Sequence, residues 1–115
     1  MHELSIAEAI EAQARLHAPP GGRIRSVEIR VGALRGLERT SLEMCWQAVT
    51  QESPLAGSEL VVEMLPWQID CPSCGRSWTS PVPFVTCSCG EERPNPTASD
   101  ELDLISMTVE EEGED

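Results

Sequence analysis

Four cysteines gathered in one short stretch constrain this sequence more than any other feature. They form two pairs, Cys71-Pro-Ser-Cys74 and Cys87-Ser-Cys89, with twelve residues between the pairs. Gly75, directly after the first pair, accepts the tight backbone turn that brings two thiolates toward one ion. Four thiolates around a tetrahedral ion leave no open position, which is typical of a structural zinc site. We therefore predict one structural zinc held by these four cysteines.

The second pair is one residue shorter than the CxxC unit of most zinc ribbons, so its ligands are less certain than those of the first. Asp70, Glu91 or Glu92 can take the place of one of its cysteines, whereas neither histidine is close in sequence. Two other interpretations stay open for the cluster: free or oxidised thiols in a loop, and an iron site of rubredoxin type. Rubredoxin sites usually use two CxxC pairs, which favours zinc.

The number and placement of the cysteines also bear on the compartment. Five cysteines are an odd number, and four of them crowd together, which favours metal ligation in a reducing compartment over a disulfide framework. No apolar run approaches the roughly 18 residues that span a bilayer. The amino terminus lacks the basic and apolar regions of a secretion signal. We expect a cytoplasmic protein.

The charge balance excludes two classes of ligand. The formal net charge is -12, from 16 Glu and 4 Asp against 8 Arg and no Lys. Nucleic-acid binding relies on clustered cations and on aromatic side chains for stacking, and this chain has few of either. The same acidic balance disfavours an anionic membrane surface. We predict that neither nucleic acid nor membrane is a partner.

Helical periodicity appears in two segments. Residues 5–17 begin with Ser5 and Glu8 at the spacing of a capping box, and a Pro-Pro-Gly-Gly sequence follows the segment. A second amphipathic helix is predicted for residues 40–50, where Thr40 and Glu43 repeat the capping-box spacing. Cys45 lies on the apolar stripe of that helix, and we interpret it as a core residue rather than a ligand.

Strand patterns appear in three segments. Residues 23–31 alternate strictly, and residues 59–65 are rich in Val and Leu. A third strand is predicted for residues 102–109, where the alternation slips by one residue between Leu104 and Met107, so we expect a bulge near Ile105. From Glu110 on, the chain is nearly all acidic and lacks an apolar face.

These elements predict an α+β fold, in which a small three-stranded sheet carries two helices on one face and an inserted four-cysteine module resembles a zinc ribbon. Residues 1–66 and 98–110 are expected to form the α+β domain, residues 67–97 the zinc-binding insertion, and residues 111–115 an acidic tail. The insertion shows almost no periodicity, so we expect it to depend on its metal for a fixed shape.

The opening MHELSIAEAI, the segment SVEIRVGALRGL, the two cysteine pairs and the closing ELDLISMTVE resemble, in that order, the HypA family of hydrogenase maturation proteins. MHEL and the cysteine pairs are the specific parts. The resemblance implies a metallochaperone with structural Zn(II) that carries Ni(II) and delivers it, with the GTPase HypB, to the hydrogenase large subunit. It leaves open whether urease is also supplied and whether the protein is a homodimer.

The resemblance assigns the nickel site to Met1, His2 and Glu3, which makes the α+β domain the nickel-binding one. A free α-amine, the amide nitrogen of His2 and its imidazole can close two chelate rings around one ion, and nickel(II) accepts such tetragonal nitrogen sites. The fourth position is open to the Glu3 amide, the Glu3 carboxylate, water or a partner's group. His17, beside the Pro-Gly turn, is interpreted as a solvated histidine at a helix end.

Three classes of function compete. The first is nickel delivery, and the second is a zinc-ribbon module that binds only protein and transfers no nickel. An enzyme is the weakest of the three, because no nucleophile stands beside a histidine, no phosphate-binding glycine loop is present and the zinc site is predicted to be closed.

Overall fold

The structure, a computed structural model, describes residues 2–111 of the chain and the side chains of residues 3–110. It divides into two compact units that the chain visits alternately. Unit 1 is built from the segment up to Arg30, from Leu37–Glu63 and from the segment that begins at Leu102; unit 2 is built from Val31–Gly36 and Met64–Glu101.

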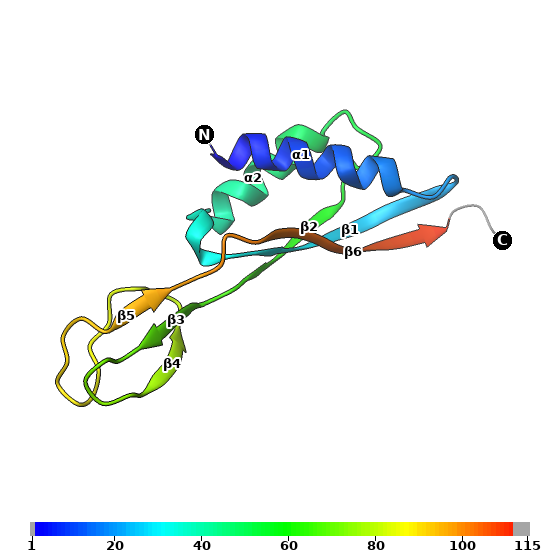
Figure 1. Cartoon of the computed structure of the whole chain (residues 1–115). Coiled ribbons are helices and arrows are strands. Elements are labelled where there is room, and N and C mark those ends of the chain that lie inside the picture. The colour runs from blue at the N-terminus through cyan, green and yellow to red at the C-terminus, as the bar shows by residue number, and fades with distance from the viewer. Residues whose placement is uncertain (1, 112–115) are drawn as a thin grey trace. The chain divides into compact units, whose positions relative to one another are not determined.

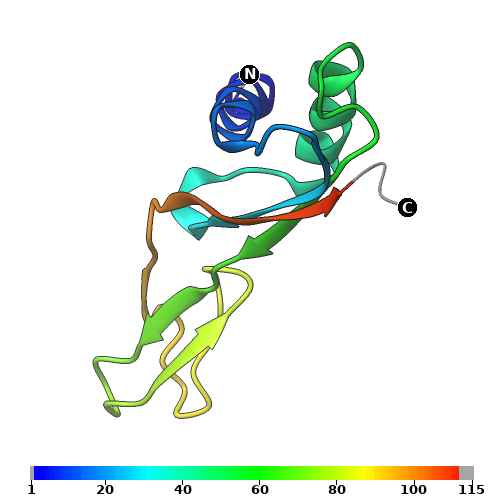
Figure 2. The ribbon, with the colours of Figure 1, turned by 90° about the vertical axis from the view of Figure 1, so that its right-hand side faces the viewer.

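Unit 1 contains both α-helices and one three-stranded sheet. Its elements are α1 (His2–His17), β1 (Gly22–Val31), α2 (Arg39–Thr50), β2 (Glu59–Met64) and β6 (Leu102–Glu111). The strands are ordered β2-β1-β6, and both helices lie on the same face of the sheet (Figures 1 and 2). The predicted α+β class is confirmed. Within the described residues, neither helix is long and apolar enough to cross a membrane.

The core of unit 1 forms where the two helices meet the sheet. Leu42 and Trp46 lie one turn apart on α2 and are completely or almost completely buried, together with Ile29 of β1 and Ala14 of α1. The indole N–H of Trp46 donates to the Ser58 hydroxyl at 3.1 Å, so the polar atom of this large side chain has a partner.

Both helices begin earlier than the sequence predicts. Helix α1 begins at His2, so Ser5 lies inside it and the predicted capping box is wrong. Helix α2 begins at Arg39, and its cap is Glu38 instead of Thr40. The Glu38 carboxylate accepts from the Ser41 N–H at 2.8 Å, which lowers the pKa of Glu38. A carboxylate at this place satisfies a free helix N–H and suits the positive end of the helix dipole.

The strands of unit 1 match their predictions closely, and the slip in β6 is present. Leu104 and Met107 are half-buried, whereas Ile105 and Ser106 between them are both exposed. The strand continues to Glu111, the first residue of the predicted acidic tail at 111–115. Residues 112–115 of that tail lie outside the described residues.

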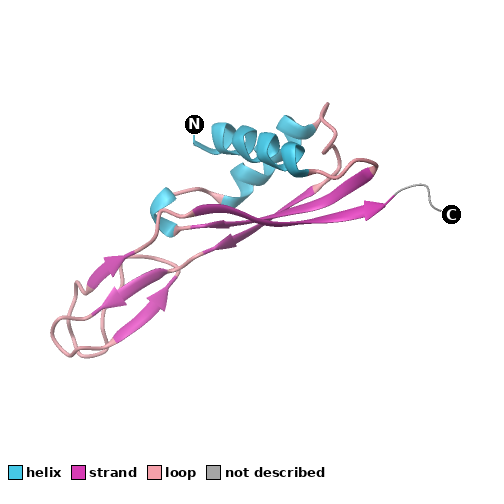
Figure 3. Cartoon of the chain, turned by 45° about the vertical axis from the view of Figure 1, so that its right-hand side comes forward, coloured by secondary structure: helices cyan, strands magenta, loops and turns pink. Residues whose placement is uncertain are grey.

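Unit 2 contains a second sheet that the sequence did not predict. Its strands are β3 (Trp67–Asp70), β4 (Ser77–Ser80) and β5 (Asn95–Thr97), in the antiparallel order β4-β3-β5 (Figure 3). The fully buried Ile69 pairs with Trp78 on one side and Pro96 on the other. Strands of three or four residues are too short to display a recognisable alternation.

A short loop of unit 2 holds the segment that leads out of the cysteine region. The Gly32 N–H donates to the Glu101 carbonyl at 2.8 Å, and the Leu34 N–H, in the 3-10 helix η1 (Ala33–Arg35), donates to the Ser99 carbonyl at 3.0 Å. A Cβ atom at Gly32 would lie 2.1 Å from the Ser99 carbonyl oxygen. Only glycine permits this close approach.

Candidate metal centre

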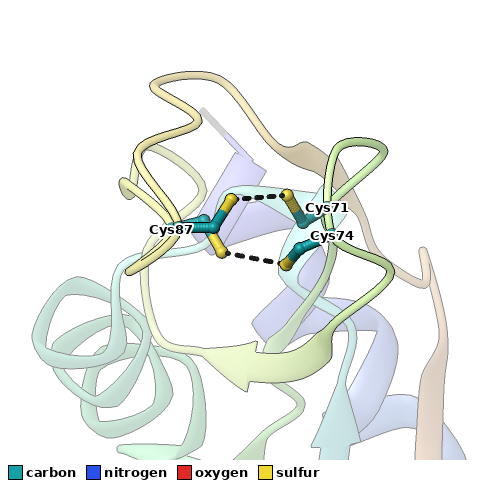
Figure 4. Close-up of side chains that lie close together, drawn as sticks. Cys71, Cys74 and Cys87 are labelled. Carbon is teal, nitrogen blue, oxygen red and sulfur yellow. Dashed lines mark hydrogen bonds between the residues drawn. The ribbon is translucent and has the colours of Figure 1, made fainter.

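The four cysteines of the two pairs meet at one point in unit 2. Their sulfur atoms all lie within 4.8 Å of one another, with 3.7 Å between Cys71 and Cys89 and 3.6 Å between Cys74 and Cys87 (Figure 4). Cys71 and Cys87 are buried, whereas Cys74 and Cys89 are exposed. Each pair therefore presents one inner and one outer sulfur.

The spacing of the sulfur atoms fits a tetrahedral ion. With zinc–sulfur bonds of about 2.3 Å, the edge of an ideal tetrahedron is about 3.8 Å. The sulfur–sulfur distances of 3.7 Å between Cys71 and Cys89 and 3.6 Å between Cys74 and Cys87 are close to that value. The four thiolates are the residues that would hold the ion, and within residues 3–110 no His, Asp or Glu side chain joins their cluster.

Backbone hydrogen bonds fix the two turns, which we call the first knuckle (71–75) and the second knuckle (87–90). In the first, the Gly75 N–H donates to the Cys71 carbonyl at 2.9 Å, and in the second the Gly90 N–H donates to the Cys87 carbonyl at 2.9 Å. Both glycines have positive φ, +81° and +105°, which is why glycine follows each pair.

The same pattern explains how a CxC pair takes the place of CxxC. The Cys71 N–H donates to the carbonyl of Arg76, and the Cys87 N–H donates to the carbonyl of Glu91, both at 2.9 Å. Each first cysteine thus makes the same two backbone bonds, and the second knuckle reaches its partners one residue sooner. The shorter turn keeps its glycine in the left-handed conformation and still brings both of its sulfurs to the cluster.

Ionisation of the cluster is uneven in the absence of a cation. The backbone N–H of Cys89 holds the pKa of Cys87 down to about 7. The Glu91 N–H favours the thiolate of Cys89, but the hydrogen bond with Cys87 and burial outweigh it and raise the pKa of Cys89 to about 12. The pKa of Cys74 is also raised, since burial and the neighbouring sulfurs outweigh the Arg76 N–H. Of these three thiols, Cys87 ionises most readily, and Cys74 and Cys89 need a cation to follow.

The carboxylates that the sequence left open as substitute ligands are outside the cluster. Asp70 accepts from the Ser77 hydroxyl at 2.6 Å, and Glu91 accepts from the Ser73 hydroxyl at 2.6 Å. Glu92 is exposed, and among the described residues the only cluster of metal-binding side chains is the four cysteines. Cys45, expected in the core, is half-buried on α2 and takes no part in it.

The predicted nickel site lies at the edge of what the structure describes. Met1 and the side chain of His2 lie outside the described residues. Glu3 is half-buried in the first turn of α1, and its Oε2 accepts from the Glu38 N–H at 3.1 Å. This contact ties the residue after His2 to the start of α2. His17 is exposed at the end of α1, as predicted, with its ring nitrogen 2.8 Å from the Gln13 carbonyl.

Side-chain contacts between the two knuckles are the feature that sequence reasoning missed. Ser73 meets Glu91, and Arg76 meets Ser88, across the cluster. The sequence does show a serine between the cysteines of each pair. It does not show which residue each serine contacts, because that depends on the folded turns.

Comparison with known proteins agrees with this geometry. The family model "Hydrogenase/urease nickel incorporation, metallochaperone, hypA" matches residues 1–109. The hydrogenase maturation factor HypA of Desulfosudis oleivorans is 36% identical over 115 residues, which cover 96% of this chain and 100% of that protein. That of Chlorobium limicola is 34% identical over 116 residues, covering 96% and 98%.

A solved structure has the same fold. The solution structure of the Ni metallochaperone HypA from Helicobacter pylori aligns with a TM-score of 0.60 and 18% identity, and the alignment covers 97% of this chain and 100% of that one. The family match spans both the amino terminus and the cysteine cluster. The chain therefore belongs to the HypA family of nickel-incorporation metallochaperones.

Proposed function

We propose that this protein binds Ni(II) at its amino terminus and delivers it during maturation of [NiFe]-hydrogenase, with a structural zinc ion at the four cysteines. The observation that carries the proposal is the family match over residues 1–109, which includes both the MHEL opening and the cysteine pairs. The protein makes and breaks no covalent bonds of a substrate. Its partners are the GTPase HypB and the hydrogenase large subunit, in the cytoplasm.

The chemistry of the first residues supports a nickel chelate. The α-amine of Met1, the amide nitrogen of His2 and the His2 imidazole are three nitrogen donors that suit a tetragonal nickel(II) site. The hydrogen bond between Glu3 and the Glu38 N–H restrains the residue that follows His2. We propose that the Glu3 amide, its carboxylate, water or a partner's group completes the site, and that this fourth position is the exchangeable one used for transfer.

The cysteine cluster supports a separate structural role for zinc. Four thiolates at tetrahedral spacing leave no position for a substrate or for nickel hand-off. Zinc would favour the thiolate forms of Cys74 and Cys89, whose pKa values are raised in the protein alone, and would hold the two knuckles together. We therefore propose that the two metals occupy different units, nickel in unit 1 and zinc in unit 2.

Nickel titration of the untagged protein tests the proposal, with zinc measured in the same samples. The His2→Ala variant should lose tight nickel binding and keep its zinc. Adding Gly-Ser ahead of Met1 keeps the imidazole but replaces the chelating amine with an amide, so nickel affinity should collapse and hydrogenase maturation should fail. Equal nickel affinity in the extended and native proteins would show that the amino-terminal chelate is wrong.

One observation favours a second function, a zinc-ribbon module for protein binding without nickel transfer. Phe84 in unit 2 is 92% exposed and borders a groove of about 730 Å³ that Pro83, Val85 and Pro94 also line. An exposed aromatic beside a groove is a common feature of protein-binding surfaces. The titration separates the two functions, because only the chaperone requires nickel affinity that depends on a free amino terminus.

A further inference from the structure

Two side-chain hydrogen bonds join the knuckles without involving a cysteine. Ser73, between the cysteines of the first knuckle, donates to Oε1 of Glu91 at 2.6 Å. Arg76 donates to the hydroxyl of Ser88, between the cysteines of the second knuckle, at 2.5 Å. The arrangement is reciprocal: the serine inside each knuckle bonds to the residue that directly follows the glycine of the other.

Both residues outside the knuckles are themselves restrained. The guanidinium of Arg76 lies 5.6 Å from the centroid of the Trp78 ring, within the range of a cation–π contact. The second oxygen of Glu91, Oε2, accepts from the Arg93 N–H at 3.2 Å. Each also supplies the carbonyl that receives the N–H of the first cysteine in its own knuckle. Little side-chain freedom remains to be lost when the bonds form.

We infer that Ser73–Glu91 and Arg76–Ser88 are two clasps that hold the knuckles at the spacing of the metal centre and slow the release of its ion. The inference rests on the structural zinc role proposed above. An ion leaves a four-thiolate site stepwise, and while the knuckles stay clasped a detached thiolate remains close enough to bind again. Loss of a clasp lets the knuckles separate. A thiolate that detaches from the ion then binds it again less often, and the ion is released sooner.

This assignment gives Glu91 a positioning role and separates it from the ligands. Both of its carboxylate oxygens accept hydrogen bonds, from Ser73 and from the Arg93 N–H. Glu91→Gln keeps an oxygen for one of these bonds and removes the charge. A ligand substituted in this way would change the geometry at the metal, whereas a clasp would change only how long the metal stays.

Zinc transfer from the full-length protein to a chromophoric chelator measures the release rate. Ser73→Ala and Ser88→Ala should each speed release about five-fold, since a hydrogen bond contributes about 1 kcal/mol net. Ser77→Ala is the matched control. Ser77 is also exposed and also donates to a carboxylate at 2.6 Å, but its partner Asp70 is on the neighbouring strand, so this bond does not cross the knuckles.

Cobalt(II) loading supplies a readout that does not depend on rates. The thiolate-to-cobalt absorption bands should be identical in the native protein, in Ser73→Ala and in Glu91→Gln, because all retain four sulfur ligands. A changed spectrum in Glu91→Gln would make Glu91 a ligand and overturn the clasp. Equal release rates for Ser73→Ala and Ser77→Ala would overturn it as well.

The same measurements separate this inference from the proposed function. A native protein that holds neither zinc nor cobalt at the cysteines would overturn both. A protein with a four-thiolate cobalt spectrum, whose release rate responds to neither serine substitution, would overturn the clasps alone and leave the structural zinc in place.

Discussion

The two units of this chain are stabilised by different means. Unit 1 has an apolar core to which α2 contributes the buried Leu42 and Trp46 and β1 contributes the buried Ile29. In unit 2, the buried apolar side chains among the described residues are Val31, Ile69 and Pro94, beside two of the four cysteines, and the large Phe84 is exposed. Burial of apolar surface stabilises the first unit, whereas we expect the second to depend on a metal ion at its four cysteines and on hydrogen bonds.

Metal removal should give the largest difference between the two units, because it should unfold unit 2 and leave unit 1 folded. Structural zinc in small modules contributes on the order of 10 kcal/mol, far more than the small core of unit 2 can replace. A chelator, or Cys71→Ser, should change the fluorescence emission of Trp67 and Trp78. Either treatment should also make unit 2 sensitive to proteases. The helical circular dichroism signal of α1 and α2 should remain.

Cys45→Ser is the control for that experiment, since Cys45 lies outside the cluster and should be replaced without loss of metal. Loss of the helical signal together with the metal would show that the units do not fold independently. An unchanged tryptophan spectrum after complete metal removal would refute the structural role of the ion.

A cavity in the core of unit 1 should have the opposite effect to metal removal: it should destabilise unit 1 and leave the metal content of unit 2 unchanged. Leu42 is completely buried, so Leu42→Ala should lower the free energy of unfolding of unit 1 by about 3 kcal/mol. Met44→Ala, on the same helix at a side chain that is 66% exposed, should cost less than about 0.5 kcal/mol. Chemical denaturation followed by circular dichroism gives both values, and zinc content should stay at one per chain. Loss of zinc in Leu42→Ala would contradict the division.

A smaller effect is expected where the chain of unit 2 packs closely on itself. Gly32→Ala forces a Cβ atom against the Ser99 carbonyl, which should cost about 2 kcal/mol. Gly36 has a φ of +64° and open space around its Cα, so Gly36→Ala should cost about 1 kcal/mol through backbone strain alone. Hydrogen exchange of the Leu34 amide, which bonds to Ser99, should accelerate only in the first variant. Equal exchange in both would refute the close contact.

The difference between the units also explains how much the sequence could predict. The spacing of apolar residues predicted both helices and all three strands of unit 1. The slip in the alternation near Ile105 was visible in the sequence because apolar and polar residues alternate along β6. The start of α2 was misplaced because Glu38, which is not one of the usual capping residues, caps this helix. Local propensity does not reveal which polar side chain will reach a free N–H.

In unit 2 the sequence predicted the four-cysteine cluster but not the strands that surround it. The spacing of the cysteines predicted a four-thiolate cluster, because metal ligands require particular residue types at short separations. The strands around Ile69 were missed, since three or four residues show no period. The bond between Ser73 and Glu91 joins residues 18 positions apart, and only the folded turns bring them together.

A buried carboxylate in unit 1 gives the finest test of the comparison. Glu11 of α1 is 7% exposed, and its oxygens accept from Arg15 at 2.9 and 3.0 Å and from the Ser53 hydroxyl at 2.7 Å. The Arg15 hydrogen bonds lower the pKa of Glu11 against the opposing effect of burial. The carboxylate thereby links α1 to the turn after α2.

Protonation of Glu11 should therefore destabilise unit 1 in acid. Because the pKa is lower in the folded protein than in the unfolded chain, the stabilisation is fully present above the ordinary glutamate value of about 4.3 and is lost as pH falls through the lowered pKa. Arg15 is 54% exposed, so the contribution is about 1 kcal/mol.

Glu11→Gln should lose that amount at neutral pH and show a flatter acid dependence of unfolding. Glu63→Gln, which breaks the exposed pair with Arg30, should change the free energy of unfolding at neutral pH less. An unchanged acid slope in Glu11→Gln would mean that other carboxylates govern the acid stability of this unit. A metal ion at the cysteines of unit 2 should also be released in acid, because the thiolates take up protons, so metal release must be followed separately from the helical signal.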